Sequence, residues 1–316
     1  MDIRRLEHFL ALLDFKQFNR AARELGVSQQ AVSKAIAKLE EEVGVTLFER
    51  SAYGVSPTEQ AKALEQHART IIAEARLAMA NLNALNKSKR AALNIGIGPS
   101  QATHFMPAAI NAFRAVRPGI GIRAFVEFAP SLQQMLIAGD VDLVVNAPPA
   151  DFKFASNLTV HRLFEEVDML AVRAAHPLAG KTSVTITDLL PFSWLAPRQN
   201  RSLWQSVCNA YADQGLPPPV DVMITDSEQL KLGLMLDSDF LSIIDTNAMA
   251  QEVNTGLLRC IHVNGLTMRR PAVLSHRSRG QLSSAARTMM TIVRRLARQQ
   301  QGARIAGGVK GGSAAR

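Results

Sequence analysis

The sequence contains few residues of the kinds that cross-link or anchor a chain. Its 316 residues include two cysteines, Cys208 and Cys260, which excludes a disulfide framework and a cysteine-rich zinc module and favours a reducing compartment. No run of about 18 consecutive apolar residues occurs, so we predict no membrane-spanning helix and no membrane partner. The amino-terminal residues lack the apolar stretch of a secretory signal, and we therefore expect a cytoplasmic protein.

Basic charge is present in excess, but it is unevenly distributed. The net charge is +9, yet residues 1–60 hold eight basic against nine acidic side chains, and residues 91–286 hold fifteen against sixteen. The surplus lies in residues 61–90, with six against two, and in residues 287–316, with seven basic and no acidic side chains. Net charge alone therefore does not predict DNA binding, and residues 301–316 are predicted to form a basic disordered tail. The length indicates two or three domains.

Three short helices are predicted in the first sixty residues. Apolar residues at helical spacing mark the first helix, at Leu6, Phe9, Leu10 and Leu13. Asn19 is predicted to cap a second helix at 20–25, and Ser28 to cap a third helix after the break at Gly26. In the third helix the inward positions are Val32, Ile36 and Leu39, which leaves a polar face at its amino-terminal end. This order of helix, tight turn and polar-faced helix is typical of a helix-turn-helix.

The polar face of the third helix carries the chemistry that DNA recognition needs. Side-chain amides pair with adenine edges in the major groove, a hydroxyl can serve several bases, and lysines reach phosphate oxygens. Residues 50–55 are predicted to form a short β wing beside it. The predicted DNA-binding residues are Asn19, Arg20, Ser28, Gln29, Gln30, Ser33, Lys34, Lys38 and Arg50. A small helical packing module with a polar face is the alternative interpretation.

The motifs of this region resemble the amino-terminal signature of the LysR-type transcriptional regulators. They are FNRAA at 18–22, LGVSQ at 25–29, AVSK at 31–34, LE at 39–40 and GVTLFER at 44–50. The sequence departs from the family pattern at Gln30, where Pro is usual, at Lys16-Gln17, where Gly-Ser is common, and at 57–61, which lacks the usual Gly. The resemblance implies a winged helix-turn-helix DNA-binding domain at residues 1–60.

A long helix with a heptad seam is predicted after the wing. Ser56-Pro57-Thr58-Glu59 has the form of a capping box with Pro at the first helical position. Steps of three and four separate the seam residues Ala61, Leu64, Ala68, Ile71, Ala75, Ala78, Leu82 and Leu85. The helix could pack on its own domain, whereas the family resemblance implies a linker at 61–90 that dimerises through 61–85 and supports a dimer of dimers. Two recognition helices held in a dimer would read a two-fold DNA site.

Residues 91–300 alternate strand and helix patterns, which predicts an α/β fold with a mostly parallel sheet. Strands are predicted at 93–98, 121–128, 142–146 and 169–173, and helices at 105–116 and 131–138. This order resembles the family's effector-binding domain, in which crossing strands join two lobes as in periplasmic solute-binding proteins. Residues near 265–296 are expected to complete the first lobe.

Ligands of open α/β sheets bind at the carboxyl ends of strands, near helix amino termini. That rule selects the candidate effector-binding residues Ser100, Gln101, Thr103, Ser131, Asn146, Arg198, Arg201, Ser202 and Thr225. Ser131 could instead be a plain helix cap, and the two arginines could be surface residues. If an arginine faces the cleft, the site would favour a small carboxylate or another anion.

A stretch near residue 240 departs from the family pattern in the same half. Asp237 and Asp239 fall where related sequences usually have a Gly-x-Gly turn, and Asp245 falls where Pro is common. Carboxylates at these positions could change the closure of the lobes or disfavour an anionic effector, so the ligand class stays open.

No catalytic residue, metal site or cofactor is predicted. Gly96-Ile97-Gly98 follows a predicted strand, but Gln101 stands where a dinucleotide fingerprint needs its third glycine. The seven histidines show no metal-ligand spacing, and residues 98–102 lack the closing glycine of a nucleophile elbow.

The resemblance therefore implies a sequence-specific transcriptional regulator, not an enzyme. Its expected partners are double-stranded promoter DNA, a small-molecule effector, further copies of the chain and RNA polymerase. Two alternatives stay open: an oligomeric DNA-binding regulator without a ligand, and a solute-binding or enzymatic carboxyl-terminal half.

Overall fold

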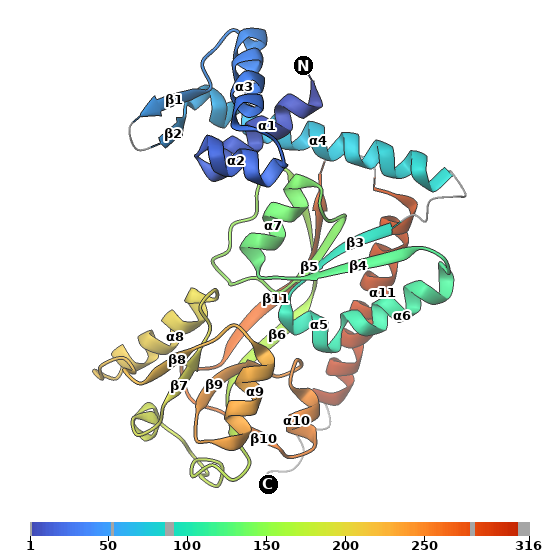
Figure 1. Cartoon of the computed structure of the whole chain (residues 1–316). Helices are drawn as coiled ribbons and strands as arrows, with labels where there is room; N and C mark the ends of the chain where they lie inside the picture. Colours follow the sequence, from blue (N-terminus) through green and yellow to red (C-terminus); the bar gives the residue numbers. More distant parts are fainter. Residues whose placement is uncertain (1, 52–53, 86–91, 279–281, 309–316) are drawn as a thin grey trace. The chain divides into compact units, whose positions relative to one another are not determined.

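The computed structural model describes residues 2–51, 54–85, 92–278 and 282–308 (Figure 1). The chain divides into two compact units. One comprises Met1–Ala92 and Gln134–Val141, and the other Leu93–Gln133 and Asp142–Arg316. Among the described residues, no helix is both long and apolar enough to cross a membrane.

The first unit is a helical domain with a two-stranded wing and a long helix (Figure 1). Its elements are α1 (Ile3–Phe15), α2 (Phe18–Leu25), α3 (Gln29–Val43), β1 (Phe48–Ser51), β2 (Gly54–Pro57) and α4 (Glu59–Leu85). The predicted inward residues of the first and third helices form one buried core with Phe48, Val55 and Ala61. Gly26 and Gly44 end α2 and α3 at positive φ, a conformation that glycine adopts without a Cβ clash. The predicted helix-turn-helix is present, and β1 and β2 form the two strands of the predicted wing.

Two of the predicted helix caps in this unit differ from the structure. Asn19 lies inside α2, which begins at Phe18, two residues before the predicted start, because Phe18 packs on the core. Thr58, not Ser56, caps α4: its Oγ1 lies 3.2 Å from the amide nitrogen of Ala61, while Pro57 belongs to β2. Ser28 caps α3 as predicted, since its side chain accepts a hydrogen bond from the amide of Ala31.

The side chains of α4 have different surroundings along the helix. Ala61, Ala68 and Ile72 are buried against the core of their own unit, and Leu64 packs against it. Ile71, which lies on another side of the helix from Ile72, is 37% exposed, and Met79 is 59% exposed. The predicted seam therefore packs within the unit at Ala61, Leu64 and Ala68, whereas Ile71 and Ala78 are exposed. The side chains of Leu82 and Leu85 lie outside the described set.

The second unit is built on one nine-stranded sheet with two lobes (Figure 1). The strand order is β4-β3-β5-β11-β6-β9-β7-β8, with β10 paired to β6. The first lobe comprises β3 (Ala92–Ile97), α5 (Pro99–His104), α6 (Met106–Val116), β4 (Gly121–Val126), α7 (Ala129–Ala138), β5 (Leu143–Asn146) and α11 (Ser284–Gly308). From Gln134 on, α7 belongs to the first unit.

The second lobe has its own hydrophobic clusters around Trp194 and Met235. Its elements are a 3-10 helix (Ile186–Leu189), β7 (Trp194–Ala196), α8 (Arg201–Ala212), β8 (Val222–Ile224), α9 (Glu228–Asp237), β9 (Leu241–Asp245), α10 (Ala250–Asn254) and β10 (Leu258–Ile261). Each lobe therefore has a separate interior, which is the two-lobed architecture that the sequence predicts.

Two long antiparallel strands, β6 (Leu158–Arg173) and β11 (Met268–Arg277), connect the lobes. Parallel pairs occur within each lobe, but β6 and β11 pair antiparallel to each other and to their other neighbours. The sheet is therefore mixed, and the prediction of a mostly parallel sheet was wrong. The reason is that both connecting strands lie in the middle of the sheet.

The last helix returns the chain to the first lobe, as predicted for residues near 265–296. Met289 and Val293 of α11 belong to the same core as Phe113 of α6. The helix continues to Gly308, so residues 301–308 are helical and the predicted disordered tail is too long. The side-chain amide of Gln301 donates a hydrogen bond to the carbonyl of Leu163, which holds this part of the helix to β6. Residues 309–316 lie outside the described residues.

Candidate functional site

The outward face of α3 is the first candidate site. Burial of Val32, Ile36 and Leu39 fixes the rotation of the helix about its axis, because these residues fill the core. The opposite face therefore presents the predicted base- and phosphate-binding side chains to solvent. Gln29, Gln30, Lys34 and Lys38 are exposed and Ser33 is half-buried, while Asn19 and Arg20 are exposed on α2. The side chain of Arg50 lies outside the described set.

Three consecutive acidic residues, Glu40 to Glu42, follow this face, and Glu40 has a structural role that the sequence did not indicate. Its Oε1 accepts hydrogen bonds from the backbone amides of Leu47 at 2.7 Å and Phe48 at 3.1 Å. A second residue of the run, Glu42, forms an ion pair with Arg5 of α1. These contacts hold the end of α3 to the start of the wing and to α1, which positions the recognition face relative to the wing.

The second candidate site is a cleft between the two lobes of the second unit. It encloses about 980 Å³ of empty space, a volume that includes the part open to solvent. Its first-lobe wall includes Ser100, Gln101 and Asn146, and its second-lobe wall includes Gln199 and Thr225. Ser100 and Gln101 lie in the first turn of α5, directly after β3, and Asn146 ends β5. The cleft therefore lies at the carboxyl ends of strands, where ligands of open α/β sheets bind.

Four of the nine predicted effector residues line this cleft: Ser100, Gln101, Asn146 and Thr225. Thr103 is exposed, and its hydroxyl donates to the carbonyl of Ser100 at 2.9 Å. Ser131 lies inside α7, which begins at Ala129; it is neither part of the cleft lining nor the plain helix cap of the alternative interpretation. Arg201 and Ser202 begin α8 and are not part of the cleft lining.

Arg198 is also absent from the cleft lining. Its side chain is 72% exposed and forms an ion pair with Asp226, with 3.1 Å between Nε and Oδ2. The same carboxylate accepts hydrogen bonds from the backbone amides of Arg198 and Gln199. Neither predicted arginine therefore supplies positive charge to the cleft, which removes the basis on which the sequence favoured an anion.

The cleft lining has more acidic than basic residues. Five carboxylates line it against two cations: Glu127, Asp168, Asp226, Glu228 and Asp245 against Lys231 and Arg270. Lys231 pairs with Glu228 at 2.6 Å. The guanidinium of Arg270 pairs with Asp168, with 2.8 Å between Nη2 and Oδ1, and also donates to the carbonyl of Ala147. Both cations are therefore already paired within the protein.

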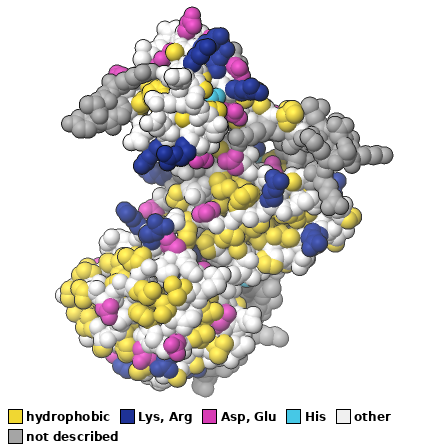
Figure 2. Space-filling view, viewed as in Figure 1, with side chains coloured by type: hydrophobic (Ala, Val, Ile, Leu, Met, Phe, Trp, Pro, Cys, Tyr) yellow, Lys and Arg dark blue, Asp and Glu magenta, His cyan; other side chains and the backbone are white. Residues whose placement is uncertain are grey.

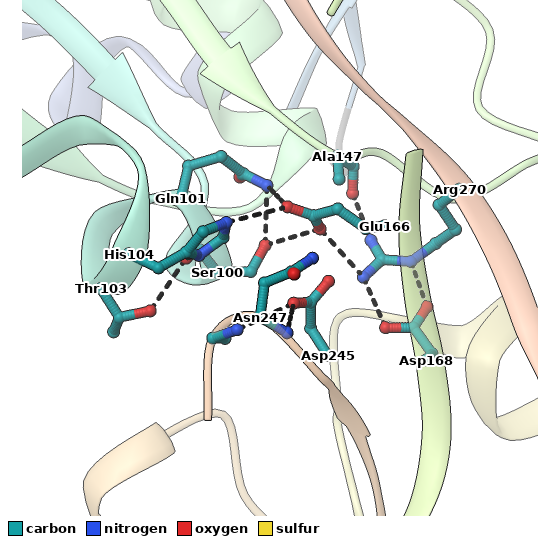
Figure 3. A network of polar contacts seen from close by, with 11 residues as sticks. Ser100, Gln101, Thr103, His104, Ala147, Glu166, Asp168, Asp245, Asn247 and Arg270 are labelled. Atoms are coloured by element: carbon teal, nitrogen blue, oxygen red, sulfur yellow. Dashed lines mark hydrogen bonds and ion pairs between the residues drawn. The ribbon is translucent and has the colours of Figure 1, made fainter. Parts of the chain in front are cut away.

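A buried polar network lies behind the cleft, where β6 and β11 pass between the lobes (Figure 3). Glu166 of β6 is fully buried, and its carboxyl accepts hydrogen bonds from the Ser100 hydroxyl at 3.0 Å and from the Gln101 side-chain amide. Burial and the adjacent carboxyl of Asp245 raise the pKa of Glu166 to about 9. Burial lowers the pKa of Arg270, but Asp168 and the neighbouring carboxyls together raise it above its ordinary value.

Close packing fixes the first-lobe wall of this network. A Cβ added at Gly98 would lie 2.4 Å from Oε1 of Gln101 and 2.9 Å from Cβ of Asn146. Such distances are shorter than van der Waals contact, so only glycine lets β3 approach β5 this closely before α5 begins. Gly98 thereby positions Ser100 and Gln101 against Glu166.

Sequence reasoning missed most members of this network, namely His104 as a site residue, Glu166, Asp168 and Arg270. Asp168 and Arg270 are 102 positions apart, so no local spacing connects them. The sequence did point to Asp245, as a departure from the family pattern, and Asp245 lines the cleft. Asp237 and Asp239 do not line the cleft. Asp239 instead forms an ion pair with Arg173, with 2.9 Å between Oδ1 and Nη2.

Comparisons with known proteins identify the family of both parts of the chain. Residues 3–62 match the family described as "Bacterial regulatory helix-turn-helix protein, lysR family", and residues 86–298 match the "LysR substrate binding domain". The HTH-type transcriptional regulator GalR of Pseudomonas putida is 30% identical over 298 residues, which cover 94% of this chain and 74% of that protein.

Two solved structures show the same fold along nearly the whole chain. ArgP from Mycobacterium tuberculosis gives a TM-score of 0.66 at 16% identity and covers 94% of this chain and 97% of its own. Full-length CbnR complexed with its target DNA gives a TM-score of 0.50 at 20% identity and covers 94% of this chain and all of its own. The chain belongs to the LysR family of DNA-binding transcriptional regulators, with an amino-terminal helix-turn-helix and a carboxyl-terminal domain that senses a small molecule.

Proposed function

We propose that this regulator reads a promoter through the amino-terminal face of α3. The observation that carries this assignment is the exposed set Gln29, Gln30, Lys34 and Lys38, opposite three fully buried apolar residues. Gln29 and Gln30 would contact base edges, while the lysines and the exposed amides of the first turn would contact phosphates. A chain of the same fold, CbnR, has been solved in complex with its target DNA, which supports DNA binding by this chain.

The substitution Gln29→Ala tests this assignment. Loss of a base-reading amide should weaken binding to the specific promoter site by about 1–3 kcal/mol while binding to random duplex changes little. Gln66→Ala, which removes an exposed amide from α4, is the matched control and should leave both affinities unchanged. Equal losses on specific and random DNA would remove Gln29 from the base-reading set.

The cleft of the second unit is the proposed effector site. Because its carboxylates outnumber its cations and both cations are paired, we expect a small polar molecule that carries a positive charge or hydrogen-bond donors, not a simple anion. The midpoint of thermal unfolding, measured with matched cationic and anionic compounds, tests this preference. Stabilisation by anions alone would reverse the expected class, and no response to any compound would favour a regulator without a ligand.

Self-association is proposed through two kinds of apolar surface. On its exposed side α4 presents Ile71 and Met79, which suits pairing with the same helix of a second copy. In the second unit, the two end strands of the sheet expose Val126 on β4 and Ile224 on β8, and hydrophobic side chains reach the surface over both lobes (Figure 2). These surfaces support a dimer through α4 and a dimer of such dimers.

In the proposed mechanism, effector binding shifts a pre-existing equilibrium between two arrangements of the oligomer on promoter DNA. This requires that the effector bind the two arrangements with different affinity. The change would alter DNA bending and the contact with RNA polymerase. We expect the protein to act in the cytoplasm, where its DNA target is accessible, and without catalytic turnover.

A further inference from the structure

Three potential metal ligands from distant parts of the chain meet in the buried network behind the cleft. They are a ring nitrogen of His104 and one carboxylate oxygen each of Glu166 and Asp245, and all three atoms lie within 4.8 Å of one another. His104 ends α5, Glu166 lies in the middle of β6, and Asp245 ends β9 (Figure 3). Two sheet strands and a helix thus direct one imidazole and two carboxyls to a common point.

The histidine is held in the tautomer that a metal ligand needs. Nδ1 of His104 lies 2.6 Å from the carbonyl oxygen of Ser100. A carbonyl only accepts hydrogen bonds, so Nδ1 carries the proton and Nε2 presents a lone pair. Nε2 lies 3.9 Å from Oε1 of Glu166. Metal-binding histidines are commonly oriented in this way, with the other ring nitrogen donating to a carbonyl.

Asp245 directs a buried oxygen to the same point. Its Oδ1 accepts hydrogen bonds from the backbone amides of Asn247 at 2.8 Å and Ala248 at 2.9 Å. Its Oδ2 is buried and receives no hydrogen bond from a nitrogen donor or a hydroxyl group among the described residues. It faces the carboxyl of Glu166, and two carboxyl oxygens that meet in a buried site need a proton or a cation between them.

The charge of the surrounding network leaves room for a divalent ion. Arg270 pairs with Asp168, so that carboxylate is neutralised within the protein. Glu166 and Asp245 would together carry two negative charges when ionised, and Arg270 reaches Glu166 only at 3.7 Å. One divalent cation would balance these two charges, whereas a shared proton balances only one of them.

We propose that His104, Glu166 and Asp245 bind a first-row divalent transition metal ion, of the class represented by Zn²⁺ and Mn²⁺. Imidazole and carboxylate together suit these ions, whereas Mg²⁺ and Ca²⁺ prefer oxygen ligands alone. The three ligand atoms would close on the ion by side-chain rotation. Asp245 lines the cleft, so solvent reaches the site from that side and can supply the remaining ligands.

The bound ion would connect α5 of the first lobe to β6 and to β9 of the second lobe. If the carboxyl-terminal domain senses ligands as proposed above, metal occupancy would bias the arrangement of the two lobes that an effector also biases. The metal site itself depends only on the three side chains. Its test is therefore a binding measurement without DNA, whose failure would leave the regulator function untouched.

The experiment is calorimetric titration of the full, chelator-treated chain with ZnCl₂, MnCl₂ and MgCl₂, together with thermal unfolding at each metal concentration. One equivalent of Zn²⁺ or Mn²⁺ should bind and raise the midpoint of unfolding, and Mg²⁺ should do neither. Absence of stoichiometric binding for both transition metals, or equal binding of Mg²⁺, would overturn the proposal.

Variants assign the binding to this site. His104→Asn keeps an amide donor for the Ser100 carbonyl but has no atom at the Nε2 position, so it should lower the metal affinity by about 100-fold or more. His276→Gln is the matched control, because His276 lies outside the proposed site and forms a close pair with His161, with 3.2 Å between their Nε2 atoms. Retained affinity in His104→Asn, or loss only in His276→Gln, would contradict the assignment.

A second variant guards against a folding defect in the first. Asp245→Asn has nearly the same shape and keeps an oxygen for the amides of Asn247 and Ala248, but it removes one negative charge. It should fold and lose most of its metal affinity. A folded Asp245→Asn protein that binds metal as tightly as the original would overturn the proposal independently of His104.

Discussion

At the scale of single residues, His176 makes folding stability depend on pH. The ring is 3% exposed, its Nε2 donates to the carbonyl of Asp239 at 3.2 Å, and its Nδ1 accepts from the amide of Leu178 at 3.0 Å. Both contacts suit the neutral ring. Burial lowers the pKa of His176, against the opposing effect of Asp239.

The expected consequence is a loss of stability on mild acidification. With its folded-state pKa below the unfolded value of 6.5, His176 binds more protons in the unfolded chain than in the folded one as pH falls through 6.5. Its contribution is therefore complete above 6.5 and is lost as pH falls from there toward the folded-state pKa. Urea unfolding at pH 7.5 and 5.5 should show a smaller pH effect in His176→Gln than in the original chain. The exposed His262, changed to Gln, is the control, and equal pH effects in all three proteins would contradict the assignment.

Residue-level prediction from sequence succeeded where the determining contacts are local. The role of Ser28 follows from its position before a periodic helix, and the inward residues of α3 follow from their spacing. The buried polar network behind the cleft could not be predicted in this way. Whether Asp168 meets Arg270 depends on the register of β6 against β11, which is set by contacts across the sheet.

At the scale of elements, the exposed apolar side of α4, with Ile71 and Met79, carries the proposed dimer contact. Ile71→Glu would place a charge on the exposed apolar stripe and should raise the dimer dissociation constant about tenfold or more, equivalent to about 1.4 kcal/mol. Gln66→Glu introduces the same charge at an exposed position outside the seam and should leave the dimer intact. Light-scattering mass measured over a dilution series distinguishes them, and an unchanged dissociation constant in Ile71→Glu would place the dimer contact elsewhere.

Most elements were predicted from the sequence, but several boundaries were not. The prediction that Asn19 caps the second helix was wrong because Phe18 packs on the core, so that α2 begins at Phe18 and includes Asn19. The short α5 was missed because Pro99, which begins it, reads from the sequence as a break after a strand. In α11 the extension to Gly308 accompanies the tertiary contact of Gln301 with Leu163, which composition does not reveal.

At the scale of the whole molecule, the family motifs predicted both the DNA-binding domain and the effector-binding domain. The cleft lies at the carboxyl ends of strands, as predicted for a ligand site in an open α/β sheet. The charge of the cleft was not predicted, because Arg198 pairs with Asp226 and buried carboxyls from crossing strands replace the expected cations. The mixed sheet was not predicted because the alternation of strand and helix patterns does not show that β6 and β11 pair antiparallel in the middle of the sheet.

The most direct test of the central claim is capture of genomic DNA fragments by the purified chain, sequenced without assuming an operator. A specific regulator with two recognition helices should enrich a few sites with two-fold symmetry, and this enrichment should persist at physiological salt concentration. Diffuse binding without an enriched sequence, lost as the salt concentration rises, would contradict base reading by α3 and leave only non-specific attraction to phosphate.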